Sequence, residues 1–408
     1  MGIVALDKLG SGCILSQDVR DINGRLLLTK GKAVDREQIR LLKMWGVAEV
    51  DVQGPIESAA APLDGQNPKR KAIEGALVRM LQNVDTEHPA IVTIIKSAIE
   101  YRFQHNFMLG FEDPKRLSPD FRFDLHRAVQ TQIRFSEIQL PESPQIVTQF
   151  NEVAANPRSS GNDLAEVVNT SPSLAAILLK IANSAIFGFP SRIDTVSRAV
   201  ALLGTREVGS LIMGISVMRL FSNIPKDLVD MSTFMRHSLA CGLLSRIMAA
   251  RLNRPNTEQM FVAGLLHDIG RLVWYRYFPE QAGLCLELAR KTGLSLYEIE
   301  TECSGINHEQ IAAQLLDKWK LPETLTDCIV YHHRPSRCPD PTGPGIVQMA
   351  DLAVNALGLG HSGEHAVPHF DARVWNRLNL SPNALKISIG QTIEQMDIMG
   401  TPHWGLAE

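Results

Sequence analysis

A histidine and an aspartate stand side by side, as His267 and Asp268, in the otherwise apolar run Gly264-Leu-Leu-His-Asp-Ile-Gly270. If this run is helical, Asp268 is in line with Leu265 and Leu272, on the stripe that faces the protein interior. An ionised carboxylate in the interior is costly unless it is paired or bound to a metal. The dipeptide therefore indicates either a buried hydrogen-bonded pair or part of a metal site.

Further histidines lie on the apolar faces of helices predicted nearby. His237 is aligned with Cys241 at helical spacing, and His308 follows Asn307, which with Gln310 predicts a capping box at the start of a helix. Imidazole and carboxylate groups suit divalent metals of intermediate hardness. One such histidine is ordinarily a core or surface residue, but the whole set predicts a metal site made of His237, His267, Asp268, His308, His332, His333 and Asp351.

The order of these residues resembles that of a known superfamily. His237, the His267-Asp268 pair and Asp351 match the pattern that names the HD superfamily of metal-dependent phosphohydrolases. His308 and His332-His333 fall where the HD-GYP branch, the cyclic di-GMP phosphodiesterases, has its extra histidines. The resemblance implies one metal held by the first four residues and a second held by the three histidines, with Asp268 bridging the two. Iron, manganese and zinc are the cations expected.

Residues 137–358 as a whole resemble the HDOD domain, an HD-related output domain of bacterial signalling proteins. The resemblance implies a mainly α fold, an HD-like helical bundle, and a regulatory role in which the domain binds a partner signalling protein or a nucleotide. The motifs that carry it are Leu140-Pro141, Asp163–Leu174, Leu178–Gly188, Ile193–Gly204, Leu315–Pro322 and Tyr331–Pro335.

Two departures from the catalytic pattern favour regulation over hydrolysis. No Gly-Tyr-Pro follows His332-His333, and Arg271 stands where the catalytic His-Asp-Ile-Gly-Lys run has lysine. Arginine does not replace a lysine neutrally, because lysine offers a compact charge suited to a phosphate. We therefore expect a signalling protein with a divalent metal. The alternative is a metal-dependent phosphohydrolase acting on a cyclic dinucleotide or another nucleotide, in which the cations activate a water.

Composition places the chain among ordinary globular proteins. It has 408 residues, 45% of them hydrophobic and 21% charged, with a formal net charge of -3. This balance lacks the basic surface typical of nucleic-acid binding, so we expect no DNA partner. The six cysteines are scattered without a Cys-x-x-Cys pair, which is typical of reduced thiols in the cytoplasm. No apolar run has the length of a membrane span, so no membrane association is expected.

The N-terminal residues predict a small α+β module. Strands are expected at Cys13–Leu15, Leu26–Leu28 and Val47–Val52, with Asn23-Gly24 as a hairpin turn. A helix is expected from Asp35 to Trp45. The stretch resembles the small domain found ahead of some HD-GYP domains, which implies a sensory or docking role.

Five regions are predicted along the chain. Residues 1–53 are the α+β module, 54–68 a linker, 69–136 a helical spacer, 137–358 the HDOD domain, and 359–408 a loop with C-terminal helices.

The loop near the C-terminus carries His361, His365 and His369, which are spaced four apart. On a helix they would form a ligand face. Because glycines and Pro368 surround them, a mobile loop is the favoured interpretation.

Overall fold

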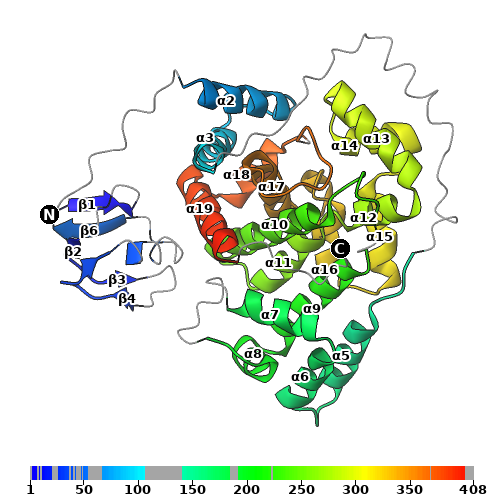
Figure 1. Ribbon diagram of the computed structural model, residues 1–408, viewed down its shortest axis with the longest axis horizontal. Helices are drawn as coiled ribbons and strands as arrows, with labels where there is room; N and C mark the ends of the chain where they lie inside the picture. Colours follow the sequence, from blue (N-terminus) through cyan, green and yellow to red (C-terminus); the bar gives the residue numbers. More distant parts are fainter. Residues whose placement is uncertain are drawn as a thin grey trace.

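The structure is a computed structural model that describes residues 2–6, 9, 12–20, 26–35, 38–39, 42, 47, 49–53, 67–105, 140–183, 192–221, 224–367 and 369–399. These residues are mainly helical, with a small β module at the N-terminus, which confirms the predicted fold class (Figure 1). The Asn23-Gly24 turn, the helix end at Trp45, linker residues 54–66 and spacer residues 106–136 lie outside the described residues.

The N-terminal module contains two small antiparallel sheets. The first has the order β1 (Gly2–Ala5), β6 (Glu49–Gln53), β2 (Cys13–Leu15) and β5 (Ala33–Val34), and the second pairs β3 (Val19–Arg20) with β4 (Leu26–Leu28). Strand β2 alternates, with Cys13 and Leu15 buried and Ile14 45% exposed. The module therefore has its own small core, which includes Val34, Leu42 and Val50.

The remaining described residues form a helical body. Its elements are α2 (Pro68–Met80), α3 (Pro89–Gln104), α5 (Gln145–Ala155), α6 (Gly161–Asn169), α7 (Pro172–Ala182), α8 (Val196–Leu203), α9 (Thr205–Arg219), α10 (Met231–Arg251), α11 (Thr257–Leu266), α12 (Ile269–Tyr277), α13 (Pro279–Thr292), α14 (Leu296–Ser304), α15 (His308–Lys318), α16 (Glu323–Val330), the 3-10 turn η3 (Pro335–Arg337), α17 (Thr342–Leu357), α18 (Ala372–Leu378) and α19 (Pro382–Met399).

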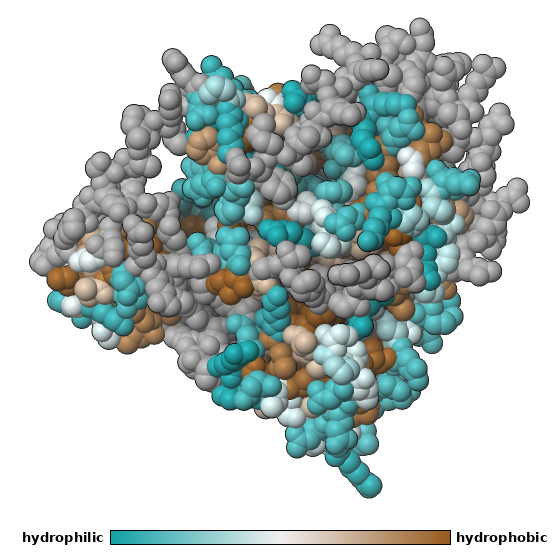
Figure 2. Space-filling model, in the orientation of Figure 1, coloured by the Kyte–Doolittle hydropathy of each residue, from teal (hydrophilic) through white to brown (hydrophobic). Residues whose placement is uncertain are grey.

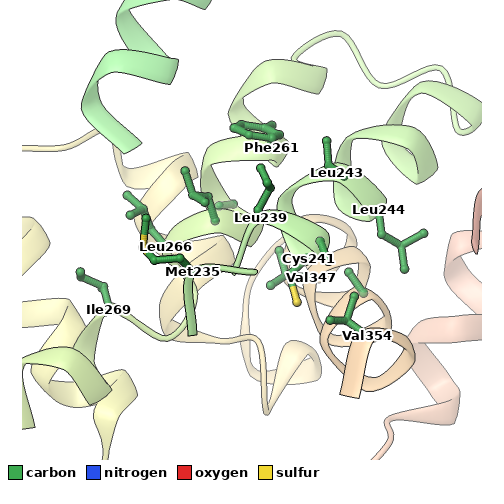
Figure 3. Close-up of a cluster of buried hydrophobic side chains, with 14 of the residues drawn as sticks. Met235, Leu239, Cys241, Leu243, Leu244, Phe261, Leu266, Ile269, Val347 and Val354 are labelled. Atoms are coloured by element: carbon green, nitrogen blue, oxygen red, sulfur yellow. The ribbon is translucent and has the colours of Figure 1, made fainter. Parts of the chain in front are cut away.

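Helix α10 is the centre of this body. It packs against α11, α17 and α19, and most of its residues are buried. Figure 3 shows side chains of α10, α11 and α17 meeting in this core, among them Leu239, Phe261 and Val347. Helices α10 and α11 approach closely because Gly264 has no side chain: a Cβ there would lie 2.6 Å from the Cys241 carbonyl oxygen. This contact fixes α10 against the end of α11.

Helices on both sides of the HDOD motifs share the same core. Helix α3 packs against α17 and α19, and one continuous cluster of buried side chains runs from Ile73 in α2 to Met399 in α19. Buried Arg102 of α3 donates hydrogen bonds to the carbonyl oxygens of Ala356 (2.7 Å) and Asn355 (3.2 Å), which satisfies the C-terminus of α17. Helix α3, which lies in the predicted helical spacer, thus supports α17, whereas the predicted domain boundaries stay a prediction.

Hydrophilic residues are spread over much of the visible face of the helical body (Figure 2). Among the helices that the structure describes, none combines the length and apolarity needed to cross a membrane.

The approach of α12 to α15 supports a stability test. A Cβ at Gly270 would lie 1.9 Å from the backbone oxygen of His308, so Gly270→Ala has to push the two helices apart. We expect it to lower the free energy of unfolding by about 1–3 kcal/mol or more, measured as a lower Tm by circular dichroism.

Gly390→Ala in α19 is the matched control. Among the described residues, no atom beyond its chain neighbours and its own helix backbone lies within 4 Å of its Cβ position, so this variant is expected to gain about 0.5–1 kcal/mol from helix propensity. Equal melting of the two variants would contradict the close contact.

Candidate metal centre

The seven predicted ligands meet at one buried place in the helical body. They come from α10, from the junction of α11 and α12, from the start of α15, from the turn after α16, and from α17. No member is more than 7% exposed. The members are His237, His267, Asp268, His308, His332, His333 and Asp351.

Local structure places several of these side chains at helix ends. Asn307 and Gln310 form the predicted capping box, which puts His308 in the first turn of α15. The prediction of one helix through Gly264–Gly270 is wrong in one respect: α11 ends at Leu266 and α12 begins at Ile269. His267 and Asp268 form the buried junction, where their side chains can project to one centre.

The first ligand group consists of His237, Cys241, His267 and Asp351. The Nε2 atom of His237 lies 3.1 Å from Asp351 Oδ1, 3.4 Å from His267 Nε2 and 3.6 Å from Cys241 Sγ. All four ligand atoms lie within 4.8 Å of one another, which is close enough for one cation to contact them after small movements.

The second ligand group consists of Asp268, His308, His332 and His333. Asp268 Oδ1 lies 3.4 Å from His308 Nε2 and 3.9 Å from His332 Nε2, and the Nε2 atoms of His308 and His333 are 3.0 Å apart. The other oxygen of Asp268 faces the first group, 3.2 Å from His267 Nε2. Asp268 is therefore shared between the two groups.

In three of the histidine rings, a hydrogen bond from Nδ1 determines which ring nitrogen is available to bind a metal. The Nδ1 atoms of His267, His308 and His332 lie 2.8, 2.5 and 2.6 Å from the oxygens of Gly264, Glu300 and Ile329. Carbonyl and carboxylate oxygens only accept, so each Nδ1 carries the hydrogen, and in the neutral ring Nε2 keeps its lone pair.

These free nitrogens point at one another and at carboxylates, as metal ligands do. Within the described part of the chain, Asp268 Oδ1 and His332 Nε2 are buried without a hydrogen-bond partner. Buried polar atoms without partners are costly. A cation in the second group would satisfy both atoms, and the first group offers imidazole and carboxylate donors of the same kind. The residues therefore fit the metal that the pattern predicts.

The pKa values of the ligand side chains indicate their protonation states when no cation is bound. Burial lowers the pKa of His267, but Asp268 and Asp351 outweigh it and raise that pKa to about 10. Burial, with His267 and His308, lowers the pKa of His332 to about 3. Burial and the two carboxylates raise the pKa of Cys241 well above its usual value. A proton on His267 then takes the place of a cation, and metal binding has to displace it.

The guanidinium of Arg271 forms an ion pair with Asp268. The side chain is 1% exposed, and its NH1 donates to Asp268 Oδ2 (3.1 Å) and to Ser362 Oγ (2.7 Å). Its NH2 donates to Glu364 Oε2 (2.9 Å), and its Nε lies 3.4 Å from Glu300 Oε1. Both terminal nitrogens of this side chain thus donate to buried partners, whereas Nε has an ion-pair contact with Glu300 but no hydrogen bond. Arg271 therefore belongs to the frame of the site.

The loop after α17, residues 358–367, crosses over Arg271 and its partners. We call this loop the strap. Tyr275 donates to the Ser362 carbonyl oxygen (2.7 Å), and the Leu296 amide donates to Glu364 Oε1 (2.8 Å). Gly360 packs where a Cβ would lie 2.3 Å from the Thr233 carbonyl oxygen. The strap is not helical, as predicted, and its histidines His361 and His365, like His369 just beyond it, are outside both ligand groups.

Several residues of the site were not predicted. Cys241 was noted only as lying on the same helical face as His237, and that spacing of four was the available signal. Glu300 and Glu309 bind the backbone or rings of the histidines: Glu300 contacts His308, and Glu309 accepts from the His333 amide at 3.0 Å. Ser362 and Glu364 had no local signal, because their partner Arg271 is far away in the sequence.

Comparison with known proteins identifies the domain around this site. Residues 140–335 match the model of the HDOD domain family. The chain therefore contains an HDOD domain, as its motifs predicted.

Two crystal structures have a similar fold. One is a candidate phosphohydrolase from Shewanella amazonensis SB2B, with 22% identity, a TM-score of 0.51, and coverage of 65% of this chain and 97% of that one. The other is a candidate signal transduction protein from Marinobacter aquaeolei VT8, with 24% identity, a TM-score of 0.51, and coverage of 73% and 68%. At these identities the likeness concerns the fold alone.

An uncharacterised protein of Treponema pallidum (strain Nichols) is 22% identical over 299 residues. The match covers 70% of this chain and 57% of that protein, so the chain spans little more than half the length of this relative.

The buried ion pairs and hydrogen bonds of Arg271 lead to a prediction for the stability of the protein. Arg271→Met leaves the carboxylates of Asp268, Glu300 and Glu364 buried without their cation, and breaking a buried ion pair in this way costs about 3–5 kcal/mol. Thermal unfolding of the full chain is the measurement. Arg271→Lys, which keeps one charge but fewer donors, is expected to fall between the parent and Arg271→Met.

Arg254→Met is the control for this variant. Arg254 pairs with Asp340 at 3.0 Å, but the two side chains are 42% and 64% exposed, and such a pair contributes at most about 1 kcal/mol. If removing Arg271 costs no more than removing Arg254, the arginine does not organise the site.

Proposed function

We propose that this protein is a regulatory component of bacterial signalling whose HDOD domain holds divalent cations in two adjacent ligand groups and acts by binding a partner protein or a nucleotide. One observation carries the proposal: the buried carboxylate of Asp268 is shared by two clusters of imidazole nitrogens whose lone pairs face inward. Cytoplasmic location stays a prediction from the scattered cysteines.

The chemistry of the donors supports iron, manganese or zinc. Nitrogen and carboxylate oxygen together suit these cations better than magnesium or calcium, which prefer oxygen alone. The oriented rings of His267, His308 and His332 are typical of metal ligands, whose second nitrogen donates to a carbonyl or carboxylate oxygen. A bound cation would neutralise the carboxylates and supply Lewis acidity.

The burial of the ligand side chains and the role of Arg271 favour a centre that binds metals without catalysing the turnover of a substrate. A phosphodiester has to reach the cations, yet the ligand side chains are 0–7% exposed. Arg271, at the position of the catalytic lysine, faces four internal partners and does not reach outward. We therefore assign the centre a role in fixing the conformation that a partner recognises.

A metal-dependent phosphohydrolase is the second candidate. The sharing of Asp268 favours it, because two cations linked by one carboxylate are an arrangement used for phosphodiester hydrolysis. On this interpretation Asp268 and the second group would lie at the reacting phosphate of a cyclic dinucleotide.

Metal content tests the proposed function. Plasma mass spectrometry of the purified full chain is expected to find two equivalents of iron, manganese or zinc. Asp268→Asn keeps the shape of the side chain but removes its charge, and we expect it to lose at least one equivalent.

Asp230→Asn is the matched control for metal content. Asp230 caps the start of α10 through its hydrogen bonds to Ser232 and Thr233, and asparagine caps equally well, so its metal content is expected to equal that of the parent. A parent chain that binds no metal after reconstitution would overturn the proposal.

An activity assay separates the two candidates. The metal-loaded parent is expected to hydrolyse cyclic di-GMP no faster than Asp268→Asn does, measured by chromatography of the products. Turnover in the parent that disappears in Asp268→Asn but persists in Asp230→Asn would replace the regulatory proposal with the hydrolase.

A further inference from the structure

Sulfur distinguishes the first ligand group from the second. Cys241 contributes its Sγ to the first group, together with His237, His267 and Asp351, whereas the second group has three imidazoles and one carboxylate. The Cys241 side chain is fully buried, and its Sγ is 3.6 Å from His237 Nε2. The donors of the two groups are therefore chemically different.

The backbone holds this sulfur in place. Cys241 follows His237 by one helical turn, so both side chains lie on one face of α10. The contact of Gly264 with the Cys241 carbonyl oxygen, where a Cβ would be 2.6 Å away, keeps this turn of α10 against α11. Because His267 begins the junction directly after α11, the same contact also sets the distance between the sulfur and the second imidazole.

The ordinary role of a buried cysteine is that of a small apolar side chain. Cys241 does lie among apolar side chains of α10, α11 and α17 (Figure 3). Cys285, Cys303, Cys328 and Cys338 are also buried, but among the described residues they belong to no group of potential metal ligands. Packing and local hydrogen bonds, such as that of Cys328 Sγ to the Thr324 carbonyl oxygen, account for those four. They do not explain why the Cys241 Sγ lies within 4.8 Å of two imidazole nitrogens and a carboxylate oxygen.

We infer, building on the proposed metal pair, that Cys241 is a metal ligand and that the first group is a zinc-selective site with two nitrogens, one sulfur and one oxygen. Zinc takes four such donors tetrahedrally, and thiolate favours it over harder cations such as manganese. Binding converts the thiol to a thiolate and releases its proton to solvent. Four protein donors of this kind are typical of a structural zinc, and the shared Asp268 carboxylate lies beside them.

The second group differs in selectivity on the same grounds. Its donors are Asp268, His308, His332 and His333, which include no sulfur, so its selectivity for zinc is weaker. The two halves of the centre are then unequal: the first fixes α10, α17 and the α11–α12 junction together, and the second exchanges its cation more readily.

Cobalt(II) provides the test, because it takes the place of zinc and reports its ligands by absorption. Apo full-length chain titrated with cobalt is expected to show a near-ultraviolet band from thiolate-to-cobalt charge transfer together with visible ligand-field bands. Cys241→Ser is expected to lose the charge-transfer band and keep ligand-field absorption. Cys285→Ser, which changes an equally buried cysteine outside both groups, is expected to give the parent spectrum.

The outcomes separate this inference from the proposed function. Cobalt binding without the charge-transfer band in the parent, or with the same band in Cys241→Ser, overturns the role of Cys241 and leaves the metal pair standing. No cobalt binding at all overturns both. If Cys241→Ser does not fold, zinc-edge X-ray absorption of the zinc-loaded parent decides: one sulfur neighbour at about 2.3 Å is expected, and its absence overturns the inference.

Discussion

The burial of the Asp268 carboxylate is the constraint on which the rest of the site depends. The side chain is 1% exposed, and its two oxygens face different ligand groups. Burial raises the pKa of this carboxyl, but Arg271, His267 and His308 outweigh it and hold the pKa well below its usual range. The carboxylate is therefore charged, and the surrounding helices have to supply positive charge. Arg271 supplies part of it, and cations bound by the imidazoles would supply the remainder.

The arginine frame ties this carboxylate to parts of the chain that are distant in sequence. Ser362 and Glu364 stand 91 and 93 residues after Arg271 and both accept its hydrogen bonds. Glu364 also accepts from the first amide of α14, and Glu300 links the arginine to His308. A change of charge in the metal centre would therefore alter the electrostatic interactions of the strap and of α14. In the proposed regulatory function, these links would connect the metal centre to the strap and to α14.

The sequence predicted the local parts of this arrangement better than the long-range ones. Asn307 and Gln310 act on neighbouring backbone atoms, so the capping box before His308 could be predicted from spacing alone. The convergence of His237 with Asp351 followed from the resemblance to HD proteins, because periodicity does not determine which helices meet. The nearest glycines, Gly264 and Gly270, lie within α11 and α12, so no proline or glycine marks the break at His267-Asp268 itself. Ser362 and Glu364 lie in a non-helical strap, where no periodic pattern shows which side chains face inward.

Cations held in the two ligand groups, on either side of Asp268, can be located by anomalous X-ray diffraction from crystals of the metal-loaded protein, recorded on both sides of the metal absorption edge. We expect two anomalous peaks, one among His237, His267 and Asp351 and one among His308, His332 and His333, with Asp268 between them. A well-ordered centre with no anomalous peak, in which the imidazoles and carboxylates contact only one another, would contradict the proposed metal pair.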